Sequence, residues 1–283
     1  MTTLGKAYVL YRKFLEFSYT AYFHKDYTLR KEKLKIFRTC LKLYRQTQGK
    51  NKDEQITVDF FDFKVTGMNA KSLLYLFEEI FLSRDYDFKT DNPAPLIIDC
   101  GANIGVSILY FKMIYPEAVI YGFEPNLVAY RLLQKNIAQN GLTGVTVQNA
   151  CLSNVREKVK FYFSEHEYSS LTSSIHHGRG GDKSYEVEAI KLSDFMEGKT
   201  VDLVKMDVEG AEYEILNDLV ETGTIRNAKQ YIIEFHHNIP NIPHRFSTFL
   251  TKIEDCGFGF NIKGDFMKLG EFQDVLVYYY RRG

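Results

Sequence analysis

The alternation of strand-like and helix-like segments from Leu96 onward constrains the fold of this chain most. Short apolar and β-branched runs predict strands at residues 96–100, 118–123, 144–149, 201–206 and 230–235. Segments with the periodicity of amphipathic helices lie between them, at residues 104–114, 126–139 and 209–220. Because parallel strands need crossover helices between them, this pattern predicts an α/β fold with a mostly parallel sheet.

Further elements complete this region, which we assign to one core domain of residues 96–283. Extra strands are expected near residues 157–163 and 185–190. The C-terminal part is expected to hold a helix at 243–255 and strands at 258–262 and 274–280.

Residues 51–95 are expected to lead into the core domain and to pack on it. The run from Ile56 to Val65 alternates like a strand and changes face at Phe60 and Phe61, as a bulge or a hairpin would. A helix is expected at residues 72–82, where apolar residues recur at helical spacing.

Residues 1–50 form a basic, amphipathic extension with two expected helices within residues 4–47. They hold 12 Lys and Arg against 3 Asp and Glu, whereas the rest of the chain holds 24 against 33. A basic stripe flanks an apolar one in the second helix, through Lys31, Lys35, Arg38, Lys42 and Arg45. The helix either docks on the core or carries residues 1–47 to an anionic membrane surface or acidic partner. Nucleic acid is not expected, because the remainder is net acidic.

We expect a cytoplasmic protein, with peripheral membrane association as the alternative. No stretch approaches the roughly 20 apolar residues that cross a bilayer, and no signal peptide is indicated. The four cysteines are far apart and form no Cys-x-x-Cys pair, so neither a zinc site nor a disulfide framework is predicted.

A loop of small residues joins the first core strand to its helix. It runs Asp99-Cys100-Gly101-Ala102-Asn103-Ile104-Gly105, which is suited to close approach of a nucleoside beside a helix N-terminus. Glu124 ends the next strand, where a carboxylate accepts both hydroxyl hydrogens of a ribose. Two glycines in a turn are weak evidence alone, and Glu124 adds the context that makes a cofactor site the favoured interpretation.

Asp99 favours S-adenosylmethionine over a dinucleotide. A pyrophosphate would avoid this carboxylate, whereas the amino group of a methionine moiety would pair with it. The chain also lacks Gly-x-Gly-x-x-Gly at this position. Asn149, at the end of the third strand, is either a contact to the adenine edge or an ordinary turn residue.

Charged residues also follow the later strands. Lys205, Asp207 and Glu209 alternate at the end of a buried strand, and His236 ends the next one. Ligands of open parallel sheets bind at these carboxyl ends. We therefore expect Asp207, Glu209 and His236 to act on a substrate in this crevice.

These segments together resemble the FkbM-type methyltransferases. The resemblance rests on residues 98–105, 123–125, 205–212 and 234–236, and it covers roughly residues 92–240. It implies a class I methyltransferase fold, with a seven-stranded sheet whose last strand is antiparallel. It also implies S-adenosylmethionine as donor and a hydroxyl acceptor on a sugar, glycan, lipid or natural product.

The resemblance also implies roles for particular residues. The cofactor positions that it carries over are Asp99, Gly101, Asn103, Gly105 and Glu124. It places Asp207, Glu209 and His236 on the acceptor side. Residues 1–50 lie outside the resemblance, so it says nothing about their role.

The residues leave several mechanistic alternatives open. His236 is favoured as the base that takes the acceptor proton, because imidazole titrates near neutrality. Alternatively, Asp207 and Glu209 hold a divalent cation such as Mg²⁺. The polar segment 169–181 is either an acceptor-binding lid or a surface loop.

Two other functions compete with the methyltransferase. One is a catalytically silent binding module of the same fold, and the other is a nicotinamide-dependent oxidoreductase. The sequence does not identify the acceptor or the oligomeric state.

Overall fold

The computed structural model describes most of the chain, which divides into two compact units, Met1–Asp85 and Tyr86–Gly283. The described residues are 30–47, 54–163, 183–240, 242–264 and 271–282, together with 12, 15, 18, 19, 22, 23 and 174. Within the described residues, no helix has the length and apolar character needed to span a membrane.

The N-terminal unit contains a helix, a hairpin and a second helical segment. Its elements are α2 (Arg30–Thr47), β1 (Ile56–Phe60), β2 (Phe63–Gly67), α3 (Ala70–Leu76) and the π-helix η1 (Phe77–Leu82). The strands pair antiparallel, so the change of face predicted at Phe60 and Phe61 is a hairpin. The turn requires a left-handed backbone at Phe61, whose φ is 53°.

Two residues of the predicted basic stripe pair with the hairpin of the same unit. Lys42 Nζ lies 2.8 Å from Asp59 Oδ2, and Lys35 Nζ lies 2.5 Å from Asp62 Oδ2. Ile36 and Leu43 of α2 are fully buried. Most of the first expected helix lies outside the described residues.

A seven-stranded mixed sheet forms the centre of the larger unit. Its order is β11-β12-β10-β9-β3-β4-β5. The strands are β3 (Leu96–Cys100), β4 (Val119–Phe123), β5 (Val145–Gln148), β9 (Val201–Met206), β10 (Ala228–His237), β11 (Phe258–Gly264) and β12 (Gln273–Arg281). The first five are parallel, and β12 runs antiparallel to both of its neighbours. The predicted class I methyltransferase topology is confirmed.

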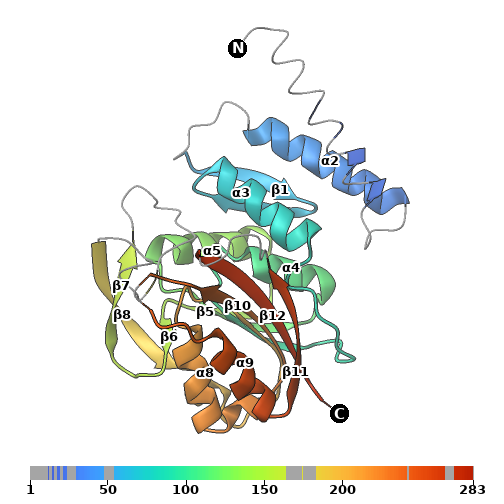
Figure 1. The fold of residues 1–283 in the computed structure, drawn as a ribbon. Helices are drawn as coiled ribbons and strands as arrows, with labels where there is room; N and C mark the ends of the chain where they lie inside the picture. The colour runs from blue at the N-terminus through green and yellow to red at the C-terminus, as the bar shows by residue number, and fades with distance from the viewer. Residues whose placement is uncertain are drawn as a thin grey trace. The chain divides into compact units, whose positions relative to one another are not determined.

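Helices cover both faces of this sheet (Figure 1). One face carries α4 (Val106–Ile114) and α5 (Leu127–Gln139), and the other carries α8 (Glu212–Glu221) and α9 (Phe246–Asp255). Every residue of β9 is buried, as expected for a central strand covered on both faces. Parallel strands and crossover helices therefore follow the predicted alternation closely.

A small second sheet and short helices complete this unit. The sheet has the order β6-β8-β7 and consists of β6 (Cys151–Ser153), β7 (Lys158–Phe163) and β8 (Lys183–Lys191). The short helices are α7 (Leu192–Met196) and the 3₁₀-helix η2 (Thr224–Asn227). Strands β7 and β8 were predicted. The sequence patterns missed β6 and α7, because three and five residues show too little periodicity to be recognised.

Candidate active site

The carboxyl ends of β3, β4, β9 and β10 meet at one edge of the sheet. We call residues 101–105 and 124–126 the β3–β4 loops. The His236 cluster comprises Asp207, Glu209, Glu212, His236 and Asp274. All predicted site residues except Asn149 lie in one of these two groups or at the end of β3.

Asp99 is fully buried near the end of β3. Ser107, in the first turn of α4, donates a hydrogen bond of 2.5 Å to Asp99 Oδ2. Lys205 Nζ lies 3.3 Å from the other carboxylate oxygen. A buried carboxylate is costly unless it is paired, and these two partners stabilise its charge.

Gly101 is required by a close crossing of two loops. Its φ is 81°, and a β-carbon there would lie 1.8 Å from the carbonyl oxygen of Asp207. The amide of Asp207 donates to the carbonyl of Cys100 at 2.9 Å. The loop after β3 therefore contacts the loop after β9 through the main chain, which gives Gly101 a packing reason in addition to the predicted approach of a ligand.

Gly105 and Asn103 also need unusual backbone conformations. Gly105 has a φ of 88°, and a β-carbon there would lie 2.5 Å from the side chain of Leu133. Asn103 has a φ of 49°, in the left-handed region that Asn tolerates better than most residues. The tight turn after β3 therefore accounts for the residue types at these two predicted positions.

Glu124 is buried at the end of β4 and is held by main-chain donors. Its carboxylate accepts hydrogen bonds of 2.7 Å from the amides of Asn103 and Asn126. Burial raises the pKa of Glu124 to about 7, because the two amides offset only part of the cost of desolvating its charge. This carboxyl group therefore titrates close to neutral pH in the ligand-free protein.

Asn149 lies just after β5 and contacts the chain that follows β4. Its Nδ2 donates to the carbonyl oxygens of Glu124 at 2.8 Å and Pro125 at 3.0 Å. The side chain fixes the segment beside Glu124, and its contact with an adenine stays a prediction.

Lys205 is a further functional candidate. The sequence pattern places it beside Asp207 and Glu209 but predicts no role for it. It is buried, and its Nζ donates to the carbonyl of Gly101 at 2.8 Å. Asp207 Oδ2 lies 3.6 Å away, and the ring centroid of Tyr86 lies 5.1 Å away. Burial lowers the pKa of Lys205, but the carboxylates of Asp99, Asp207 and Glu234 outweigh it and raise the pKa overall. A buried cation therefore links the ends of β3 and β9.

His236 brings the predicted acceptor-side residues together. Its Nε2 lies 3.2 Å from Glu209 Oε2 and 3.8 Å from Asp207 Oδ1. Glu209 has a φ of 57°, a left-handed conformation that costs free energy for a residue with a β-carbon. The structure thus holds Glu209 in a strained conformation in which its carboxylate faces the imidazole.

Glu212 orients His236 from the opposite side of the ring. Its Oε1 lies 2.8 Å from His236 Nδ1 and also accepts from the amide of Gly210 at 2.9 Å. Burial raises the pKa of Glu212, but His236 and the backbone donors outweigh it, so the pKa is lowered overall. An ionised carboxylate only accepts, so Nδ1 carries a proton. Sequence reasoning gave Glu212 no role.

The pKa of His236 differs from the expectation that it titrates near neutrality. Burial lowers the pKa, but the carboxylates of Glu212 and Glu209 outweigh burial and raise it well above the usual value. The ring favours its protonated form between these carboxylates. This form has no lone pair with which to accept a proton.

The antiparallel strand β12 adds another acidic residue. Asp274 is the register partner of His236 across β10 and β12, and its Oδ1 lies 3.8 Å from His236 Nε2. Donor atoms of Glu234, His236 and Asp274 lie within 4.8 Å of one another, as do those of Asp207, Glu209 and His236. Both sets combine carboxylates with an imidazole, a chemistry that suits divalent cations.

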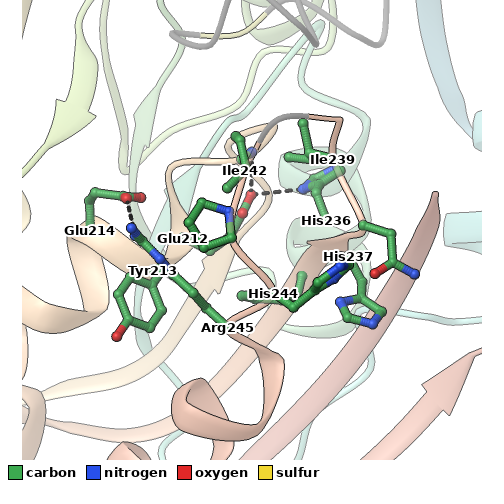
Figure 2. A pocket seen from close by; sticks show the side chains of 13 residues that line it. Glu212, Tyr213, Glu214, His236, His237, Ile239, Ile242, His244 and Arg245 are labelled. Carbon is green, nitrogen blue, oxygen red and sulfur yellow. Dashed lines mark hydrogen bonds and ion pairs between the residues drawn. The ribbon is translucent and has the colours of Figure 1, made fainter. Parts of the chain in front are cut away.

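A pocket opens beside the Glu212–His236 pair (Figure 2). Its walls are the start of α8, the end of β10 and the segment that leads into α9. Figure 2 shows the imidazole of His236 beside this pocket, with Arg245 paired to Glu214 at its rim. The hydrophobic side chains of Ile239 and Ile242 line it together with His237, His244 and several charged side chains.

The predicted lid, residues 169–181, lies outside the described residues except for Ser174. Ser174 pairs with Tyr162 of β7 through two main-chain hydrogen bonds. Its hydroxyl donates to the carbonyl of Glu209 at 2.5 Å. This contact joins Ser174 to the strained residue of the His236 cluster.

Comparison with known proteins gives consistent results. A model of the methyltransferase FkbM domain matches residues 99–260, more than half of the chain. Methyltransferase sdnD of Sordaria araneosa is 33% identical over 178 residues, which cover 52% of this chain and 69% of the relative. The 31-O-demethyl-FK506 methyltransferase FkbM of Streptomyces tacrolimicus is 24% identical, and the match covers 61% of this chain and 78% of the relative. The 2-O-methyltransferase NoeI of Sinorhizobium fredii is 25% identical, and the match covers 47% of this chain and 61% of the relative.

Proposed function

Because this chain belongs to the FkbM methyltransferase family, we propose that it is an S-adenosylmethionine-dependent O-methyltransferase acting on a sugar, glycan, lipid or small natural product. The family establishes a methyltransferase, which sets aside the silent module and the nicotinamide-dependent oxidoreductase. The names of two relatives support a hydroxyl acceptor, since both specify methylation of an oxygen. The acceptor itself is part of the proposal.

The β3–β4 loops have the chemistry that the cofactor needs. Glu124 would accept the ribose hydroxyls, and Asp99 would pair with the amino group of the methionine moiety, directly or through water. Gly101, Asn103 and Gly105 would shape the loop around the cofactor, with Asn149 near the adenine. When bound, S-adenosylmethionine supplies an activated methyl group.

The His236 cluster would handle the acceptor. Asp207, Glu209 and His236 would orient the acceptor hydroxyl and assist removal of its proton, either as a base or through a divalent cation. The strained backbone at Glu209 supports a functional role, because such strain is retained mainly where the side chain is needed. The pocket beside His236 would hold the neighbouring part of the acceptor.

The contact between Gly101 and Asp207 carries the proposal. It joins the loop of the predicted cofactor residues to the first acidic residue of the His236 cluster. Cofactor and acceptor would therefore meet across one main-chain contact, as an in-line transfer requires.

Calorimetry with S-adenosylhomocysteine followed by an acceptor screen tests this function. We expect binding of the product cofactor, and transfer of labelled methyl from S-adenosylmethionine to a hydroxyl compound. No binding by the folded protein would contradict the cofactor site. Binding with label transferred to nitrogen or carbon acceptors would contradict the O-methyltransferase.

The N-terminal extension carries a separate proposal, namely that residues 1–47 associate with an anionic membrane surface. The excess of basic residues there supports it, and such attraction should fade with salt. Lys35 and Lys42 of the stripe pair with the hairpin of the same unit, so part of the stripe is already engaged within that unit. Liposome flotation tests it: we expect recovery with anionic but not neutral vesicles, and equal recovery with both would contradict it.

A further inference from the structure

We propose that Asp207, Glu209 and His236 form a binding site for one divalent cation, with Asp274 as a fourth ligand. The site itself is argued from geometry, and only its role in acidifying the acceptor hydroxyl rests on the proposed function. The donor atoms of the first three residues lie within 4.8 Å of one another.

The orientation of His236 points to a ligand beyond its Nε2. Glu212 Oε1 already accepts hydrogen bonds from the amides of Gly210 and Val208. It therefore interacts with His236 Nδ1 by accepting a hydrogen bond from the ring N–H. The Nε2 atom is consequently the one directed at Glu209 and Asp207. A histidine that donates one ring proton to a carboxylate, with carboxylate oxygens around its other nitrogen, has the arrangement typical of metal sites. A cation would bind there by displacing the Nε2 proton of the protonated ring.

The separations between the donor atoms fit a shared ion. Two ligand atoms at about 2.1 Å from one cation are about 3.0 Å apart when adjacent and about 4.2 Å apart when opposite. His236 Nε2 lies 3.2 Å from Glu209 Oε2 and 3.8 Å from Asp207 Oδ1. Asp274 Oδ1 is also 3.8 Å from this nitrogen. Small side-chain movements would bring the atoms of Asp207, Glu209 and His236 into one coordination shell. Asp274, which groups with Glu234 and His236, would have to turn toward Asp207 and Glu209 to join them.

The two oxygens of Asp207 face different charges. Its Oδ2 lies 3.6 Å from the ammonium of Lys205, whereas Oδ1 faces His236. Lys205 also serves Asp99, so in the described part of the chain its charge is shared between two carboxylates. A divalent cation beside Oδ1 would place further positive charge next to the carboxylates of Asp207 and Glu209.

The burial of the ligands leaves the site open on one side. The side chain of His236 is 1% exposed and that of Glu209 is 17% exposed, whereas Asp274 is 45% exposed. An ion could therefore enter past Asp274 and keep water or an acceptor hydroxyl in its remaining positions. A coordinated hydroxyl is more acidic, which would relieve His236 of the role of base.

Carboxylate oxygens suit Mg²⁺ and Mn²⁺, whereas imidazole suits later transition metals such as Zn²⁺, so Mn²⁺ serves as a paramagnetic probe for a divalent site. We would titrate Mn²⁺ into the chelator-treated full chain and follow the free ion by electron paramagnetic resonance. We expect one site in the wild type, and at least tenfold weaker binding in Asp207→Asn. Glu212→Gln should weaken binding by about 10-fold to 100-fold, the usual effect of losing a residue that orients a metal ligand. Asp194→Asn is the matched control, because it removes an exposed carboxylate paired with Arg156 and should leave Mn²⁺ affinity unchanged.

S-adenosylhomocysteine affinity, measured on the same samples, separates this inference from the proposed function. No Mn²⁺ site in a wild type that binds S-adenosylhomocysteine would overturn the cation site and leave the methyltransferase intact. Equal Mn²⁺ affinity in wild type and Asp207→Asn would also overturn it. Mn²⁺ binding that Asp207→Asn abolishes, without S-adenosylhomocysteine binding, would support the cation site and contradict the cofactor site. Asp274→Asn, an exposed change, replaces Glu212→Gln if that variant fails to fold.

Discussion

The β3–β4 loops and the His236 cluster lie at the same edge of the sheet, but they are built in different ways. In the loops, main-chain amides hold Glu124, and left-handed residues shape the turn. In the cluster, side chains from the loop after β9, the start of α8 and the start of β12 converge on the imidazole of His236 in β10. The first region is thus fixed by local backbone, and the second by long-range packing and charge.

This difference predicts separable functions. A change in the loops should alter cofactor affinity or folding, whereas a change in the cluster should alter turnover with little effect on cofactor affinity. Gly101 and Asp207 are the positions where the two regions touch.

The largest expected effect is that of Gly101→Ala. Its β-carbon would overlap the carbonyl of Asp207 and would also adopt a left-handed φ, so we expect a loss of about 2 to 5 kcal/mol in unfolding free energy. Gly141→Ala is the matched control, since Gly141 has a φ of 60° with no atom near its β-carbon position. Urea unfolding of both variants measures the difference. Equal destabilisation would show that the loop crossing is not tight.

The second prediction concerns His236→Ala, measured with the acceptor that the screen identifies. We expect kcat to fall on the order of 100-fold, because the group that helps to orient the acceptor hydroxyl, or to hold the cation that acidifies it, would be lost. S-adenosylhomocysteine affinity should stay within a few-fold of wild type. A melting temperature checks that the buried substitution is tolerated. Near wild-type turnover would remove His236 from the chemistry, and a matching loss of cofactor affinity would mean that the two regions are not separable.

Much of the β3–β4 loops could be predicted from sequence, because their constraints are local. Asp99 and Glu124 stand at strand ends, and glycines mark the turn between strand and helix. The close contact of Gly101 with Asp207 could not be predicted, since it depends on how the neighbouring strand β9 is placed.

The His236 cluster was predictable only in part, for a different physical reason. Asp207, Glu209 and His236 follow strands whose carboxyl ends meet in any parallel sheet of this kind. Asp274 lies at the start of an antiparallel strand, and only the register of β12 on β10 brings it opposite His236. Glu212 has the position of an ordinary acidic residue at a helix start, and its role appears only once His236 is packed against it.

The smallest expected effect is the pH dependence of cofactor binding through Glu124. Its pKa is about 7 in the ligand-free protein. In the proposed cofactor site, the ionised form would accept hydrogen bonds from the ribose hydroxyls. Affinity for S-adenosylhomocysteine should therefore fall as pH decreases from 8 to 6, by no more than about tenfold per pH unit. Calorimetry across this range measures it. Glu124→Gln should flatten the profile, and an unchanged slope in that variant would assign the titration to another group.

The most direct test of the separation between the two regions is calorimetric titration of S-adenosylhomocysteine into three folded proteins: wild type, Glu124→Ala and Asp207→Asn. We predict that Glu124→Ala weakens binding by about 1 to 3 kcal/mol, because two ribose hydroxyls lose a charged acceptor. Asp207→Asn should bind within a few-fold of wild type, since the proposed function places its carboxylate on the acceptor side. Wild-type affinity in Glu124→Ala, or an equal loss in both variants, would contradict this account.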